Sequence, residues 1–279
     1  MSIGDRRVKR FTSLLIWFLT MVVAVIWLIP LIWMLLTSFK YESMAITLPP
    51  RWLPIPFTLE NYLKVLTDSL IPRWFLNTTI VALIVTFGVV IIDSLAAYGL
   101  ARIDFKGKNL VFWVIVSGLM IPDEVLIIPL YFLFNNLNLL NSFPALILPR
   151  LAMPLGVFIL KQFFEGLPLE LEEAAQIDGC SRLKMYWHIV MPLSKPAIAA
   201  VAVFTFIATW NAFLWPLIVA NTEEMYTIPV GIANFQGTHG TEYALLMTGS
   251  IVASLPMLVA FLFLQKQIIK GITMSGIKG

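Results

Sequence analysis

The residues with the greatest potential for chemistry lie in one polar stretch, EEAAQIDGCSRLKMYWHIVMP, which runs from Glu172 to Pro192. This stretch contains three acids, two bases and a histidine, although 59% of the residues in the chain are hydrophobic. Side chains of these types could carry out acid–base catalysis, bind a metal ion or contact another protein. The local sequence and the surrounding apolar elements decide among these roles.

The chain lacks the patterns of the common nucleotide, metal and nucleophile sites. No Gly-x-x-x-x-Gly-Lys-Ser/Thr phosphate loop is present, since the Gly107–Lys108 pair lacks the preceding glycine. His188 and His239 have no serine or cysteine partner at a suggestive spacing, and the topology derived below places them on opposite sides of a membrane. Cys180 is the single cysteine, which excludes an intramolecular disulfide. We therefore expect no cofactor and no metal ion in this chain.

Local signals predict that the polar stretch folds as helix, glycine, helix. Leu171, Ala174 and Ala175 are spaced i, i+3, i+4, so they share one helix face, and its small side chains permit close approach by another surface. Gly179 can take the left-handed conformation that ends a helix, and Ser181 can cap the next one.

The second helix of this stretch is expected to be amphipathic, and Pro192 and Pro196 are expected to stop it before the following apolar block. Its apolar stripe consists of Leu183, Tyr186, Trp187 and Val190. Periodicity alone is explained equally well by an interfacial loop that rests on lipid headgroups and by a segment that docks on a protein.

The composition of the chain is typical of a polytopic membrane protein. Only 13% of the residues are charged, about half the share of soluble domains, and the mean hydropathy is +0.87. We expect a single all-α transmembrane domain over residues 1–279, with six transmembrane helices and no separate catalytic domain. The apolar blocks place the spans near 12–37, 74–101, 110–134, 144–164, 196–219 and 243–265, with the polar segment 166–195 between the fourth and the fifth.

The distribution of Lys and Arg indicates the orientation of these spans. With both termini in the cytoplasm, 14 of the 19 Lys and Arg residues fall in cytoplasmic segments. The remaining five lie outside: Lys40, Arg51, Lys64, Arg73 and Arg150. This bias predicts that both termini and the segment 166–195 are cytoplasmic.

Four ionisable residues fall within or near the apolar blocks: Asp93, Asp123, Glu124 and Arg150. Ionisable groups at such positions are costly and usually face a bundle interior or a cavity. They could equally lie near the membrane interface or hold helices together, and both interpretations stay open.

The stretch TWNAFLWP in the fifth block is the best candidate for a cavity wall. Sugars bind to aromatic faces and to amide groups, and Trp210, Asn211 and Trp215 supply both. Core packing with an aromatic belt is the alternative interpretation.

The stretch EEAAQIDGCSRLKMYWHIVMPLSKP resembles the EAA motif of ATP-binding-cassette importer permeases. The motif positions are occupied by Glu173, Ala174, Ala175, Asp178, Gly179 and Pro192. Cys180 stands where the family usually has alanine, and it is also small. Other stretches in matching order, among them LAAYGLARIDFKGK, FTFIATWNAFLWPLIV and GITMSGIKG, look like the carbohydrate importers, and most like the second permease of maltose-type systems.

The resemblance implies a mechanism and a set of partners. Two permeases would form a heterodimer in the cytoplasmic membrane, two ATPase subunits that carry ATP and Mg would bind below, and an extracytoplasmic binding protein would deliver a sugar or oligosaccharide. The EAA helix, from Leu171 to Gly179, would dock into an ATPase cleft. Glu173 would pair with a basic residue there and Gly179 would supply the bend. No nucleic-acid partner is expected.

Three rival functions remain at this point. A permease of a related importer could carry another solute, such as a glycerol phosphate. A secondary transporter would need membrane-buried proton or sodium couplers, and an EAA-like segment would be superfluous. A membrane-embedded enzyme would need paired catalytic carboxylates, but Asp123 and Glu124 are adjacent and point in divergent directions on a helix.

The charge bias generates a test of the topology. A cysteine introduced in the loop LPPRWLPIPF, with Cys180 replaced, should react with a membrane-impermeant thiol reagent in intact cells. A cysteine at residues 104–108 should stay unmodified under the same conditions, and the opposite labelling pattern would overturn the orientation.

Overall fold

The protein is described by a computed structural model that covers residues 3–238 and 242–276, with side chains described for residues 12–234 and 242–262. Every regular element within these ranges is helical, as the sequence predicts. The chain forms two compact units, Met1–Ile71 with Asn234–Ser254 and Pro72–Ala233 with Leu255–Gly279. The single domain expected for residues 1–279 stays a prediction.

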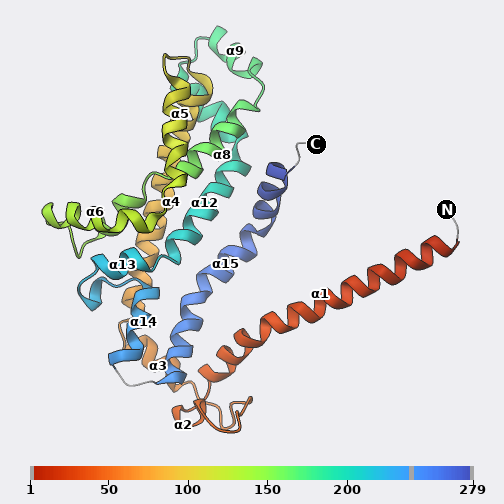
Figure 1. Ribbon diagram of the computed structural model, residues 1–279, viewed down its shortest axis with the longest axis vertical. Coiled ribbons are helices and arrows are strands. Elements are labelled where there is room, and N and C mark those ends of the chain that lie inside the picture. The colour runs from red at the N-terminus through yellow and green to blue at the C-terminus, as the bar shows by residue number, and fades with distance from the viewer. Residues whose placement is uncertain (1–2, 239–241, 277–279) are drawn as a thin grey trace. The chain divides into compact units, whose positions relative to one another are not determined.

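The helical elements follow one another in chain order, and Figure 1 labels many of them. They are α1 (Ile3–Ser38), α2 (Glu42–Ala45), α3 (Glu60–Thr67), α4 (Ile71–Arg102), α5 (Lys108–Ser117), η1 (Gly118–Met120), α6 (Asp123–Asn136), α7 (Phe143–Ile147), η2 (Leu148–Arg150), α8 (Pro154–Glu165), α9 (Glu170–Ile177), α10 (Arg182–Met185), η3 (Tyr186–Val190), α11 (Met191–Leu193), α12 (Lys195–Trp210), α13 (Leu214–Val219), η4 (Glu223–Met225), α14 (Ile228–Thr238) and α15 (Tyr243–Gly276).

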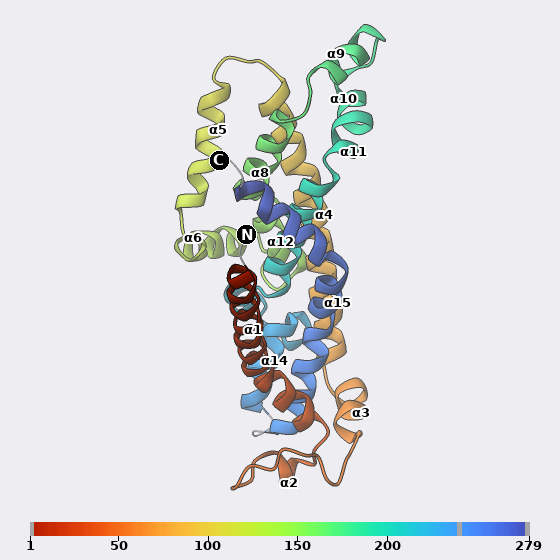
Figure 2. The same cartoon turned by 90° about the vertical axis from the view of Figure 1, so that its right-hand side faces the viewer.

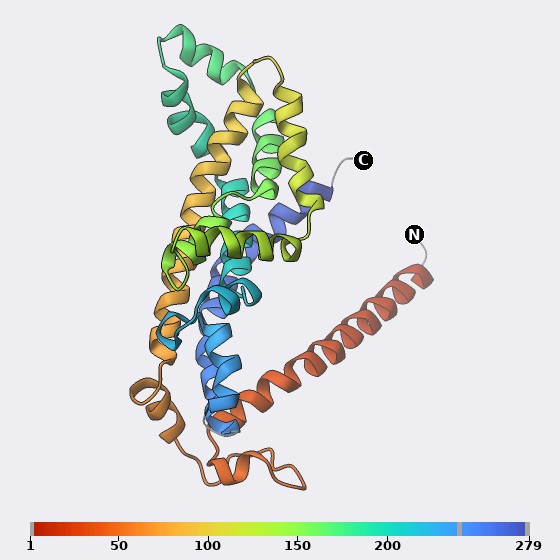
Figure 3. The same cartoon turned by 60° about the vertical axis from the view of Figure 1, so that its left-hand side comes forward.

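Three helices of the described chain are long and apolar enough to cross a membrane unaided. They comprise Thr12–Ser38 of α1, all of α4, and Tyr243–Leu262 of α15. Three further helix pairs pass the same test together but bend at a short break, by 99° between α5–η1 and α6, by 42° between α7–η2 and α8, and by 80° between α10–α11 and α12. Counting each pair as one span gives six spans, which is the number that the sequence predicts, although the third pair begins at Arg182 and the predicted fifth span begins near 196. Figure 3 shows α6 running across the direction of α4.

Prolines explain two of the broken spans. A proline ring clashes with the carbonyl group four residues earlier, and the residue before a proline avoids the helical region. Ile121, which precedes Pro122, is accordingly extended between η1 and α6, with φ −94° and ψ 116°. Met153, which precedes Pro154, is also extended, with φ −119° and ψ 110°.

The expected span over 196–219 is not one continuous helix. Its first part, α12, ends at Trp210, and α13 begins at Leu214. Pro216 lies in the first turn of α13, where its missing N–H costs nothing, but an unbroken helix would bring its ring against the carbonyl of Ala212.

Buried polar contacts at the end of α1 organise the first unit. The side-chain amide of Asn61 donates to the carbonyl oxygens of Ser38 and Lys40 at 2.9 and 2.8 Å. The carboxylate of Glu42 accepts the first two N–H groups of α15 at 2.7 and 2.8 Å, so it caps that helix. These contacts join the end of α1 to α3 and join α2 to the start of α15, although the segments are far apart in the sequence.

Lys40 is fully buried in the first unit. Its Nζ donates to the carbonyl oxygen of Arg51 at 2.6 Å and lies 4.0 Å from the ring centroid of Trp33. Burial lowers the pKa of the Lys40 ammonium, and the carbonyl oxygen and the aromatic face offset part of its lost hydration. These contacts fix the course of the loop after α1.

The second unit contains the main apolar core, in which α8 packs against α5 and α12 (Figures 1 and 2). Its fully buried side chains include Val85 and Val89 of α4 and Leu160 and Phe164 of α8. Tyr186 of η3 joins the same core, which places part of the polar segment inside the packed unit.

Candidate functional site

The polar segment folds as two short helical stretches joined by a glycine. Gly179 has φ 78° and lies between α9 and α10, in the left-handed region that favours glycine. The Ser181 side chain accepts a hydrogen bond from the N–H of Lys184 at 3.4 Å and so caps α10. The sequence predicts this arrangement.

The outer face of α9 carries apolar side chains that contact nothing else in the described chain closely enough to bury them. Leu171 and Ala174 are exposed and Ala175 is half-buried. Ile177, which the sequence analysis missed, has 87% of its surface exposed. We call Leu171, Ala174 and Ile177 the α9 ridge, because their i, i+3, i+6 spacing aligns them along the helix.

The two acids at the start of the motif have opposite environments. Glu173 is exposed beside the α9 ridge, whereas Glu172 is buried. The carboxylate Oε1 of Glu172 lies 2.6 Å from Nε of Arg102, the last residue of α4, and both side chains are 9% exposed. A second guanidinium nitrogen of Arg102 donates to the carbonyl oxygen of Leu167 at 2.9 Å. The inner face of α9 is therefore tied to the end of α4.

Two tyrosines extend this anchor along α4. The hydroxyl of Tyr98 is shared between Oε2 of Glu172 at 3.2 Å and the carbonyl oxygen of Arg182 at 3.3 Å. The hydroxyls of Tyr186 and Ser94 lie 2.6 Å apart, and the rings of the two tyrosines have centroids 5.4 Å apart. Both halves of the segment thus contact the same helix.

The predicted apolar stripe of the second helix divides between two environments. Tyr186 and Val190 are fully buried, whereas Leu183 and Trp187 are 60% and 43% exposed. The helical course ends between Pro192 and Pro196, as the sequence predicts, because α11 ends at Leu193 and the chain turns at the buried Ser194 before α12 begins. Pro192 is tolerated there because it lies in the first turn of α11.

The remaining motif residues lie at the surface of the segment. Asp178 and Pro192 are exposed, and Cys180 is half-buried next to the glycine. No atom lies within 4 Å of the position that a Cβ on Gly179 would occupy. The glycine is therefore required by its backbone conformation and not by lack of space.

The two tryptophans proposed as a cavity wall are both packed. Trp210 is 2% exposed and stacks on Phe206, with ring centroids 5.6 Å apart. Trp215 is 6% exposed and donates from its indole N–H to the carbonyl oxygen of Ala145 at 2.8 Å. Asn211 is exposed, but its amide donates to the carbonyl oxygen of Ile207 in its own helix at 2.9 Å.

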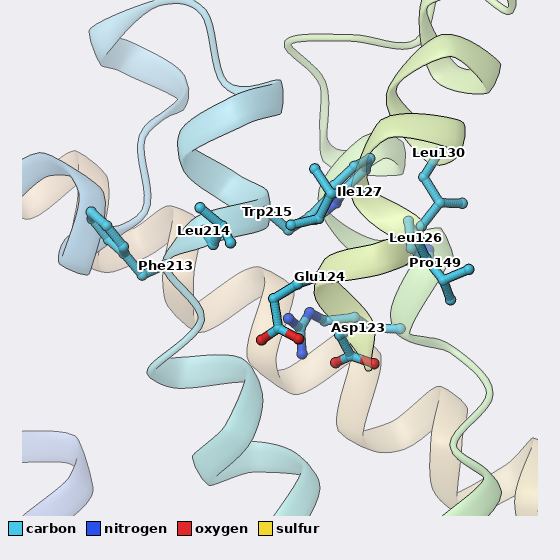
Figure 4. Close-up of a pocket in the computed structure, with 10 residues that line it drawn as sticks. Asp123, Glu124, Leu126, Ile127, Leu130, Pro149, Phe213, Leu214 and Trp215 are labelled. Atoms are coloured by element: carbon cyan, nitrogen blue, oxygen red, sulfur yellow. The ribbon is translucent and has the colours of Figure 1, made fainter. Parts of the chain in front are cut away.

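A hollow of about 270 Å³ lies within the second unit beside Trp215 (Figure 4). The start of α6 contributes Asp123 and Glu124, and η2 contributes Arg150. The break before α13 contributes Phe213 and Leu214, which the sequence analysis did not single out. The structure therefore brings Trp215 together with three of the four ionisable candidates, while Trp210 and Asn211 are not part of its wall.

Asp93, the fourth ionisable candidate, lies elsewhere. It is fully buried in α4, and its Oδ1 accepts the N–H of Met153 at 3.3 Å at the start of α8. A Cβ on Gly156 would collide with the other carboxylate oxygen, so the glycine permits this close approach of α8 to α4. These contacts correspond to the structural role considered for Asp93.

No group of three or more His, Cys, Asp or Glu side chains among the described residues could hold a metal ion. Helices long and apolar enough to cross a membrane, with a polar and partly exposed segment between two of them, define the class of polytopic membrane proteins. The chain belongs to the family of binding-protein-dependent transport system inner membrane components, whose pattern matches residues 93–274.

Similar proteins have the same architecture and related names. The chain is 37% identical over 278 residues to the arabinooligosaccharides transport system permease protein AraQ of Halalkalibacterium halodurans, covering 97% of this chain and 100% of that one. It is 38% identical over 266 residues to the trehalose/maltose transport system permease protein MalG of Thermococcus litoralis, covering 92% and 93%. The solved structure of a bacterial ABC transporter involved in import of the acidic polysaccharide alginate has the same fold, with TM-score 0.82, 20% identity and coverage of 95% and 98%. This chain is a multi-pass inner-membrane permease of an ATP-binding-cassette importer.

The Arg102–Glu172 pair generates a stability prediction. Arg102→Ala leaves a buried carboxylate without its partner, so the free energy of unfolding should fall by roughly 3–5 kcal/mol. The double variant Arg102→Leu/Glu172→Leu should recover much of this loss, because it leaves no buried charge unpaired. Unfolding of the purified permease in detergent, followed by tryptophan fluorescence, measures both.

Lys64→Ala is the matched control, since Lys64 pairs with Glu60 at 3.2 Å with both side chains about half exposed. An exposed pair at this spacing contributes only about 0.3–0.5 kcal/mol. An Arg102→Ala variant as stable as Lys64→Ala contradicts the assignment of a buried anchor.

Proposed function

We propose that this permease carries a sugar or an oligosaccharide and encloses the pathway together with a second, non-identical permease. The relatives' names, which refer to arabinooligosaccharides and to trehalose and maltose, support this solute class. The most apolar window of Thr12–Ser38 has none of its residues buried in the chain, which leaves that helix free to contact lipid or a second permease. An extracytoplasmic binding protein delivers the solute, in keeping with the family to which the chain belongs.

One observation carries the proposal for coupling to ATP hydrolysis. The helix α9 turns an apolar ridge and the exposed carboxylate of Glu173 outward, while its opposite face is held by the buried pair of Glu172 and Arg102. An exposed apolar ridge beside a charge fits a protein surface better than it fits water. We infer that each of two ATPase subunits docks on such a segment, one on each permease, and that ATP and Mg bind to the ATPases.

The anchor determines how a docked ATPase acts on the membrane part. When ATP binding moves the docked surface, α9 moves with it. Because Glu172 is paired with Arg102 and hydrogen-bonded by Tyr98, the displacement passes to the end of α4. This route requires both termini and the segment 166–195 to be cytoplasmic, as the Lys and Arg distribution favours.

The main rival within the family is an importer of an anionic solute such as a glycerol phosphate. Family membership favours an importer permease over a secondary transporter or a membrane-embedded enzyme. The solute itself is best identified from the ligand that the partner binding protein retains.

Two substitutions test docking, because they alter the exposed charge and the bend separately. Glu173→Gln should weaken ATPase retention by removing a charge-assisted contact of about 1.5–3 kcal/mol. Gly179→Val should be more damaging, since valine resists φ 78°. ATPase retention, solute-stimulated hydrolysis and uptake of the purified and reconstituted complex are measured together.

Matched controls separate these effects from a general loss of folding. Gly179→Asn should retain coupling, because asparagine tolerates the left-handed region better than valine. Glu223→Gln makes the same chemical change as Glu173→Gln at an exposed acid outside the segment and should have no effect. Docking on α9 is wrong if both test variants retain normal ATPase binding, stimulation and uptake.

A further inference from the structure

The hollow beside Trp215 lies where the chain departs from regular helix. Its charged wall is formed by Asp123 and Glu124, which follow the break at Pro122, and by Arg150 at the end of η2. Its aromatic wall follows the break between α12 and α13. Helices that break within a membrane persist where they are buried in protein or line a cavity. Secondary transporters, a different class, place their solute sites between such half-helices.

The charged residues of the hollow do not hold helices together. Among the described residues, no ion pair or side-chain hydrogen bond involves Asp123, Glu124 or Arg150. Both carboxylates are exposed, and Arg150 is partly exposed. These three side chains can therefore form hydrogen bonds with a ligand. Asp93 differs, because its carboxylate already accepts a hydrogen bond from the N–H of Met153.

The chemistry of the wall matches a saccharide. Carboxylates accept hydrogen bonds from hydroxyl groups, and a guanidinium donates to them. The apolar part of the wall is exposed mainly at Phe213 and Leu214, which are 40% and 43% exposed, whereas Trp215 is 6% exposed. The ring of Trp215 is held behind them by its hydrogen bond to Ala145 and by edge contact with Phe134, at 5.8 Å between ring centroids, so this wall is rigid. A volume of about 270 Å³ equals roughly nine water molecules of about 30 Å³, which is the scale of one sugar ring.

We propose that this hollow binds one ring of the solute during its passage. Its two carboxylates, of Asp123 and Glu124, outnumber its one guanidinium, of Arg150, and so select neutral sugars over anionic ones. The net charge of the wall is negative, so an anion is repelled while a neutral ring can use both donors and acceptors. This inference rests on the proposed function and narrows its solute class, because it disfavours glycerol phosphates and uronic acids.

The test uses thiol labelling within the assembled complex. Leu214→Cys, with Cys180→Ser, places a thiol in the wall of the hollow, and matched cationic and anionic methanethiosulfonate reagents are compared. The cationic reagent should react roughly tenfold faster, and Asp123→Asn/Glu124→Gln should remove most of that difference. The same thiol reports solute binding when labelling is repeated with glucose or with glucuronate, which differ by one carboxylate.

Glucose should slow labelling of the thiol at position 214, whereas glucuronate should leave the labelling rate unchanged. In the Asp123→Asn/Glu124→Gln variant, glucuronate should also slow labelling. Equal protection by both compounds, or by neither, overturns the proposal. A thiol that is unreactive in the complex but reactive in the isolated permease shows that the second permease fills the hollow, which also overturns it. ATPase retention by the complex is measured in parallel. Normal retention together with failed selectivity between glucose and glucuronate rejects only the proposed solute site. The coupling proposal is tested separately, by ATPase retention in the Glu173→Gln variant.

Discussion

The contact on which the remaining organisation depends is the buried pair between Arg102 and Glu172. Of the four ion pairs among the described residues, only this one has both side chains almost fully buried. Two charges removed from water are tolerated as a pair, and separating them leaves an uncompensated buried charge. The helix α9 therefore cannot leave the end of α4 without a large energetic cost. An otherwise small surface helix thereby becomes a rigid extension of a membrane span.

The same helix, α4, also meets the broken spans. Asp93 accepts the N–H of Met153 at the start of α8, and it lies next to Ser94, which contacts Tyr186, and five residues before Tyr98, which contacts Glu172. The helix pairs that bend lie in the same unit, and the hollow lies at the breaks of two of them, the break before α6 and the break before α8. Under the proposed docking, force that reaches α4 from α9 would be delivered to elements whose geometry is interrupted and can change by rotation about short connections. The proposed coupling segment and the proposed solute site would then be linked through packing in one unit.

Local features of the fold followed from the sequence, whereas long-range pairings did not. The six spans, the bend at Gly179 and the cap at Ser181 depend on composition, on neighbouring residues or on one backbone conformation. The pairing of Arg102 with Glu172 joins residues 70 positions apart, and nothing in either neighbourhood specifies it. Trp215, and not Trp210, reaches the hollow because the break between α12 and α13 resets the direction of the following side chains.

Hydrogen–deuterium exchange of the assembled importer tests most directly whether α9 is held to α4 by the buried pair. The comparison is between the native complex and one with Arg102→Ala, with peptides followed across residues 168–190 and across the core of α4 at 81–89. The account predicts much faster exchange in 168–190 and unchanged exchange at 81–89, because the anchor is lost while the apolar core remains. Unchanged protection across 168–190 would contradict it, since α9 would then be held by something other than Arg102.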